Sequence, residues 1–110
     1  MRLKVLPGVC SLAVLLSLAS VAHAQTSPAE QRGRTLARAN CARCHAIDKV
    51  SPSPLKLAPP FRTLHLRYPV ETLEEALGEG IVTGHPNMPE FRFEPDQVGD
   101  FIAFLKSLER

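Results

Sequence analysis

Apolar residues recur at helical spacing in three parts of the chain. The first part opens with SPAE at residues 27–30, which places serine, proline and glutamate where a helix start favours them, and it predicts a helix to about residues 40–44. The second predicted helix covers residues 70–79 and ends at glycines. The third starts near Pro95 and has one apolar face, formed by Val98, Phe101, Ile102, Leu105 and Leu108.

Proline-rich stretches separate these helices. Loops are predicted at residues 46–60 and 83–95, and a short helical turn at residues 61–66. No stretch alternates between polar and apolar residues as a strand does, and no internal repeat is visible. The pattern therefore predicts one all-α domain with three main helices and two stiff loops.

The first 24 residues have the pattern of a secretory signal peptide. A short basic start precedes a mostly apolar stretch at residues 5–19, and the tripeptide AHA at residues 22–24 matches a small-x-small cleavage site. A retained membrane anchor is the alternative, but the apolar stretch falls short of the roughly 20 residues that span a bilayer. We expect residues 1–24 to be cleaved and residues 25–110 to act in the periplasm without stable membrane insertion.

Charge is unevenly distributed in the remaining domain. Loss of the leader would leave eleven basic and eleven acidic residues. Residues 25–67 contain eight basic residues and two acids, whereas residues 68–110 contain three basic residues and nine acids. No basic run is interleaved with aromatic residues, so nucleic-acid binding is not expected. If the functional site lies on the basic side, its partner should be acidic.

The stretch CARCH at residues 41–45 carries the clearest chemical signal. A disulfide between Cys41 and Cys44 would close a small loop and stabilise little. A redox dithiol is expected beside a βαβ pattern, and a zinc site needs about four ligands. A c-type haem explains more: both cysteines can form thioethers with the two vinyl groups, and His45 then lies under the iron.

The mature chain resembles the class I monohaem cytochromes c, of the small periplasmic bacterial kind. Gly33, eight residues before Cys41, is similar to the glycine in the first helix of that family. The resemblance implies a cytochrome c fold in which the first and last helices cross at this glycine. It therefore implies contact between Gly33 and either Phe101 or Phe104.

Two further stretches resemble the haem-binding segments of the same family. APPF at residues 58–61 is similar to its Gly-Pro-x-Leu segment, which implies that the Pro59 carbonyl accepts the ring N–H of His45. GHPNMPEF at residues 84–91 is similar to the loop that carries the distal methionine. The predicted haem-binding residues are Cys41, Cys44, His45, Pro59 and Met88, with His45 and Met88 as iron ligands.

Met88 also has support from the sequence itself. It is the only methionine outside the predicted leader, it lies in a polar loop, and a proline follows it directly and another precedes it by two residues. A following proline biases Met88 toward an extended backbone, and a stiff loop helps to keep a weak thioether–iron bond closed. His85 is the rival sixth ligand.

Ligation by both a histidine and a methionine leaves the iron without an open position. That arrangement favours one-electron transfer over oxygenase or peroxidase chemistry, so no catalytic residue is predicted. The resemblance implies a monomeric periplasmic electron carrier, not an enzyme, with one covalent haem c and a redox protein as donor and another as acceptor. The alternatives are an electron-accepting subunit of a dehydrogenase or oxidase complex, and a haem-based gas binder.

Overall fold

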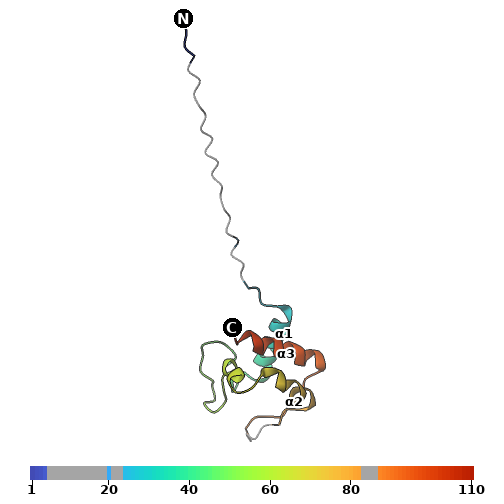
Figure 1. Ribbon diagram of the computed structural model, residues 1–110. Coiled ribbons are helices and arrows are strands. Elements are labelled where there is room, and N and C mark those ends of the chain that lie inside the picture. Colours follow the sequence, from blue (N-terminus) through green and yellow to red (C-terminus); the bar gives the residue numbers. More distant parts are fainter. Residues whose placement is uncertain (5–19, 21–23, 83–86) are drawn as a thin grey trace.

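The computed structural model describes residues 1–4, 20, 24–82 and 87–110. The described residues are helical and contain no strand, which agrees with the predicted all-α class. The elements in chain order are α1 (Pro28–Asn40), η1 (Phe61–Leu66), η2 (Val70–Thr72), α2 (Leu73–Glu79) and α3 (Pro95–Ser107) (Figure 1). Helices α1 and α3 and the turn at residues 61–66 lie where the sequence predicts them.

One helix start differs from its prediction. The helix predicted from residue 70 begins as the 3-10 turn η2 and becomes α-helical at Leu73. The cause is local: the Thr72 N–H and hydroxyl both donate to the Pro69 carbonyl, at 3.1 Å and 2.7 Å. These bonds close the tighter turn before the α-helix can begin.

The starts of α1 and α3 are stabilised by side chains near their first turns. Ser27 Oγ accepts the Glu30 N–H at 3.1 Å, and Pro28 occupies the first turn, as the sequence predicts. The Glu30 carboxylate contacts the guanidinium of Arg110 at 2.9 Å, so the end of the chain is tied to the start of α1. Glu94 is the residue directly before α3, and its N–H donates to Gln97 Oε1 at 3.0 Å.

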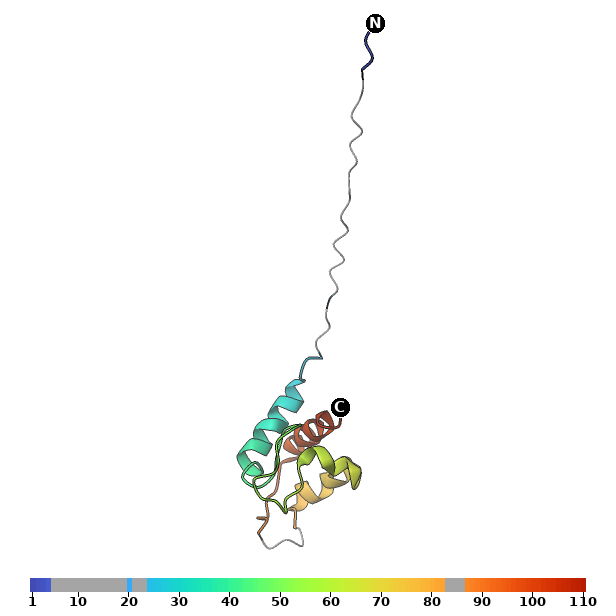
Figure 2. The same cartoon turned by 90° about the vertical axis from the view of Figure 1, so that its left-hand side faces the viewer.

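Helices α1 and α3 cross at very short range and form the most extensive contact between elements (Figures 1 and 2). A Cβ atom on Gly33 would overlap the Asp100 carbonyl oxygen and lie only 2.7 Å from Phe104 Cβ. The predicted crossing at Gly33 is therefore confirmed, with Phe104 as the contacting aromatic residue. Beside it, the Arg32 guanidinium binds the Asp100 carboxylate through two hydrogen bonds of 2.7 Å and 2.8 Å.

We expect Gly33→Ala to destabilise the holoprotein by about 1–3 kcal/mol, the usual range for overpacking. The added methyl group meets a backbone carbonyl, which cannot rotate away as a side chain would. Urea unfolding of wild type and variant measures the difference. Gly99→Ala is the matched control, because a Cβ atom at Gly99 meets nothing within 4 Å; it should be neutral or gain up to about 1 kcal/mol. Equal stability of Gly33→Ala and wild type would contradict the close crossing.

The buried core joins the helices around α3. Phe104, Leu105 and Val70 are the largest fully buried side chains. Ala37 from α1 and Cys41, directly after it, belong to the same buried cluster. The start of the predicted attachment stretch is therefore part of the hydrophobic core.

Most of the predicted signal peptide falls outside the described residues. The division into a cleaved leader, residues 1–24, and a domain, residues 25–110, stays a prediction. Within the described part of the chain, no helix has both the length and the apolar character needed to span a bilayer.

Candidate functional site

The stretch CARCH forms a tight turn directly after α1. Cys41 is the C-cap of α1, and its N–H donates to the Ala37 carbonyl at 2.8 Å. The Cys41 carbonyl in turn accepts the N–H groups of Cys44 and His45, at 3.1 Å and 2.9 Å. This turn carries two thiols and an imidazole within five residues of the chain. Both thiols are free; Cys41 is buried and Cys44 is partly exposed.

The imidazole of His45 is oriented by Pro59. Its Nδ1 lies 2.8 Å from the Pro59 carbonyl oxygen, the contact that the sequence comparison implies. Because a carbonyl can only accept, Nδ1 carries the proton, and in the neutral ring Nε2 keeps its lone pair. A ligating nitrogen beside two free thiols is the donor set that a c-type haem requires. These residues therefore fit the predicted cofactor.

The loop of residues 46–60 brings Pro59 back to the histidine through a few well-placed hydrogen bonds. The Ala46 N–H donates to Ser53 Oγ at 3.0 Å, and the Ala46 carbonyl accepts the Phe61 N–H at 3.0 Å. The Leu55 N–H donates to the Cys44 carbonyl at 3.1 Å. The loop is thus fastened to the attachment stretch on both sides of Pro59.

A second set of contacts stabilises the other part of this loop. Asp48 Oδ1 accepts the N–H groups of Val50 and Ser51, at 2.8 Å and 2.6 Å. Hydrogen bonds from Ser51, then from Val50, lower the pKa of Asp48 to about 2, so its carboxylate stays charged at all ordinary pH values. The Arg62 guanidinium donates to the Ser51 carbonyl at 2.7 Å. These contacts escaped the sequence reasoning, although Asp followed by a turn is a recognisable signal.

Phenylalanine rings connect the histidine to the other end of the chain. The Phe61 ring lies 4.8 Å from the His45 ring, and it meets Phe101 of α3 edge-on at 5.9 Å. Phe93 lies 5.4 Å from Phe101, and Phe91 lies 5.6 Å from Phe93. Edge-to-face and tilted pairs at these distances are favourable. Phe101 therefore contacts both Phe61, which packs on His45, and Phe93 in the segment that follows Met88, contacts that helical spacing alone did not reveal.

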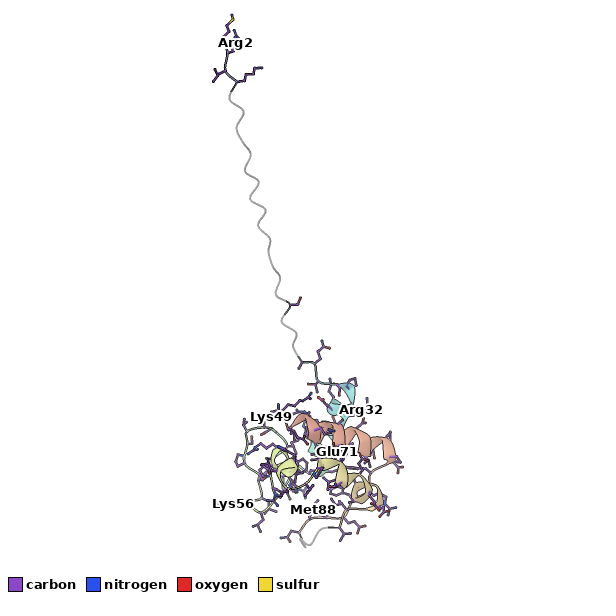
Figure 3. The ribbon with its side chains drawn as sticks, in the orientation of Figure 1. Arg2, Arg32, Lys49, Lys56, Glu71 and Met88 are labelled. Atoms are coloured by element: carbon purple, nitrogen blue, oxygen red, sulfur yellow. The ribbon has the colours of Figure 1, made fainter. Side chains whose placement is uncertain are left out.

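Met88 is partly exposed and lies on the connection between α2 and α3 (Figure 3). Two backbone hydrogen bonds close the base of this connection. The Ile81 N–H donates to the Phe91 carbonyl at 3.1 Å, and the Phe93 N–H donates to the Leu77 carbonyl at 2.9 Å. The loop that carries Met88 is thus joined at its ends, and the role of Met88 as an iron ligand stays a prediction.

The Arg92 side chain binds the end of α2 at the same place. Its Nε and Nη2 both donate to the Glu79 carbonyl, at 3.1 Å and 2.7 Å. Glu79 is the last residue of α2, where carbonyls lack helical partners and a positive charge is favourable. The chain leaves the helix at Gly80 with φ of +114°, a conformation that glycine adopts readily. This contact was not predicted, because it joins residues that lie thirteen positions apart in the chain.

Arg92→Gln should loosen the loop that carries Met88 without changing the haem content. The variant loses a charged donor to the Glu79 carbonyl, and such exposed bonds contribute about 1 kcal/mol. We expect the absorption band of sulfur-to-iron ligation in the ferric protein to disappear at lower urea than in wild type. Arg92→Lys should recover part of the difference. Arg38→Gln, at an exposed arginine of α1, is the control. Equal behaviour of both glutamine variants would contradict the role of Arg92 in holding the loop.

The other readings of the two cysteines find less support. Burial, and to a smaller extent the neighbouring Cys44, raises the pKa of Cys41 to about 12. A redox-active dithiol needs a thiolate at neutral pH, so this environment is unsuited to it. Among the residues that the structure describes, no three or more His, Cys, Asp or Glu side chains are grouped to bind a metal ion such as zinc. The rival ligand His85 lies outside the described residues.

Comparison with known proteins identifies the family. The family model described as Cytochrome c matches residues 30–109, which include the CARCH stretch, Pro59 and Met88. Neither the curated proteins nor the solved structures contain a match to this chain. Because the family match covers most of the chain, the protein belongs to the cytochrome c family: it is a haem-binding electron-transfer protein, and its cofactor is a covalently attached c-type haem.

Proposed function

We propose that this cytochrome is a periplasmic one-electron carrier with thioether bonds at Cys41 and Cys44 and with His45 and Met88 as axial ligands. The observation that best supports the proposal is the 2.8 Å hydrogen bond from His45 Nδ1 to the Pro59 carbonyl. It leaves Nε2 as the nitrogen that can bind iron. It also fixes the plane of the ring and makes the imidazole a stronger donor.

A haem held at these residues would accept one electron from a donor and release it to an acceptor. The chain controls where and at what potential this happens. His45 and Met88 would hold the iron and leave no position open to water or oxygen. The Met88 thioether favours the ferrous state and so raises the reduction potential. The phenylalanines that connect the two ligand segments keep the surroundings apolar, which disfavours the more highly charged ferric state.

Export is the second part of the proposal. The basic start, the apolar stretch and the AHA tripeptide support cleavage after residue 24. Mass spectrometry of protein recovered from the periplasm should give a chain that starts at Gln25 and carries one haem. Recovery of a full-length, membrane-bound chain would contradict this location.

Optical spectra combined with a potentiometric titration test the carrier function. We expect a six-coordinate spectrum, no carbon monoxide binding by the ferrous protein, and a one-electron Nernst slope of about 59 mV per decade. Ready binding of carbon monoxide would instead indicate a gas binder. A monomer on size exclusion at physiological salt supports a diffusible carrier, whereas a stoichiometric partner that stays bound would indicate a subunit of a dehydrogenase or oxidase complex.

A further inference from the structure

The carbonyl that orients His45 belongs to a segment that cannot anchor itself. Pro59 and Pro60 have no N–H group, so neither can donate a backbone hydrogen bond to the rest of the loop. The position of the Pro59 carbonyl therefore depends on the residues beside it. The Phe61 N–H, which donates to the Ala46 carbonyl at 3.0 Å, is one anchor. One hydrogen bond lets the segment pivot about it, so a second contact decides how firmly the carbonyl is held.

Arg62 supplies a second anchor on the same side of the two prolines. It follows Phe61 in η1, is partly buried, and donates from Nη1 to the Ser51 carbonyl at 2.7 Å. The Asp48 carbonyl lies 3.5 Å from the same nitrogen, at the limit of a hydrogen bond. A bond from a charged donor is stronger than one between neutral groups. Phe61 and Arg62 thus join η1 to two separate points in the first part of the loop.

The turn that Arg62 binds is itself held in shape. The Asp48 carboxylate accepts the N–H groups of Val50 and Ser51, so the Ser51 carbonyl lies on a closed turn and not on a free strand of backbone. Asp48 comes three residues after His45, so this turn continues the backbone that carries the imidazole. The contacts form a closed path from the histidine through the turn, Arg62 and η1 back to the carbonyl that the histidine binds.

We propose that Arg62 is a positioning residue for the proximal ligand. By binding the turn at Ser51, it fixes how the Pro59 carbonyl meets His45 Nδ1, and it thereby influences the reduction potential of the haem. This inference rests on the proposed function, in which His45 Nε2 binds the iron. A firm hydrogen bond at Nδ1 makes the imidazole a stronger donor, which favours ferric iron and lowers the potential. Loss of the Arg62 contact should therefore loosen this bond and raise the potential.

The test follows the Nδ1 proton of His45 by NMR of the ferrous holoprotein transferred to heavy water. Arg62→Gln should speed the exchange of this proton about tenfold, since one charge-assisted bond that holds the acceptor is lost. Arg62→Lys keeps the charge and a donor, so it should recover part of the difference. Arg67→Gln is the matched control, because it removes the charge of an exposed arginine at the end of η1. It should keep the wild-type exchange rate.

A potentiometric titration of the same variants supplies a second readout. Arg62→Gln and Arg67→Gln each lose one positive charge, so a comparison of the two corrects for the effect of charge on the iron. The potential of Arg62→Gln should lie above that of Arg67→Gln, because only the first variant loosens the bond to His45. Equal exchange rates and equal potentials in these two variants would overturn the positioning role and leave the carrier function intact.

Two further measurements separate this role from a general loss of stability and from failure of the proposed function. Gly33→Ala destabilises the crossing of α1 and α3 without touching the loop. If it speeds the exchange as much as Arg62→Gln does for the same loss in urea stability, Arg62 only stabilises the fold. If the ring protons of His45 in the wild-type protein lack the large upfield shift of a haem ligand, His45 does not bind the iron and the proposed function is wrong.

Discussion

Replacement of both Cys41 and Cys44 by alanine should abolish covalent haem attachment almost completely. The two sulfurs lie within one turn after α1, both are free, and they are the only cysteines of the predicted mature chain. Each single alanine variant should lose much of the attachment but not all of it, because one thioether bond remains possible. Acid-acetone extraction measures the outcome, since it removes haem that is not covalently bound.

The double variant should also accumulate poorly. A domain of this size buries little apolar surface and usually depends on a cofactor or a cross-link for stability. The extraction must therefore be normalised to the amount of polypeptide. Gly99→Ala, which keeps both cysteines, should retain its haem through the same procedure. Release of free haem from the wild-type protein would contradict covalent attachment at these residues.

Met88→Ala should change the chemistry of the site more than any other single substitution outside CARCH. We expect the long-wavelength band of sulfur-to-iron ligation to disappear from the ferric spectrum. The ferrous variant should bind carbon monoxide, because one axial position is then open. The potential should fall, by about 59 mV for every tenfold loss of preference for the ferrous state.

His85→Ala is the informative control for this prediction. The control is chosen because His85 is the only other candidate ligand in the same loop. It should leave the band and the potential nearly unchanged if Met88 is the ligand. The reverse pattern, with a silent Met88→Ala and a changed spectrum in His85→Ala, would identify a cytochrome with two histidine ligands and a lower potential. Covalent haem attachment would survive that result, but the proposed ligand pair would not.

The sequence predicts those parts of the structure that depend on local chemistry. Ser27 and Pro28 locate the start of α1, and the spacing within CARCH locates the attachment turn. Family resemblance adds two contacts between distant residues, Gly33 with Phe104 and His45 with Pro59, and both are present in the structure. Each of these features involves a residue type with an unusual property, such as a missing side chain or a missing N–H.

The features that escaped the sequence reasoning depend on how distant segments meet. Arg92 is an ordinary surface arginine until the loop brings it to the end of α2. Phe61 reads as a core residue, and only the folded chain places its ring against His45. Leu57 was also not foreseen: a leucine in a proline-rich loop gives no indication that the backbone of Leu55 and Ala58 is hydrogen-bonded while the Leu57 side chain stays exposed.

The burial of Cys41 has a consequence for the order of assembly. Its thiol shares a core with α3 (Pro95–Ser107), a helix that follows it much later along the chain. Until that helix arrives, Cys41 cannot be enclosed, and its pKa of about 12 belongs only to the closed domain. A thiol reacts as its thiolate, so we expect haem attachment at Cys41 to be faster before α3 docks than after the core has closed.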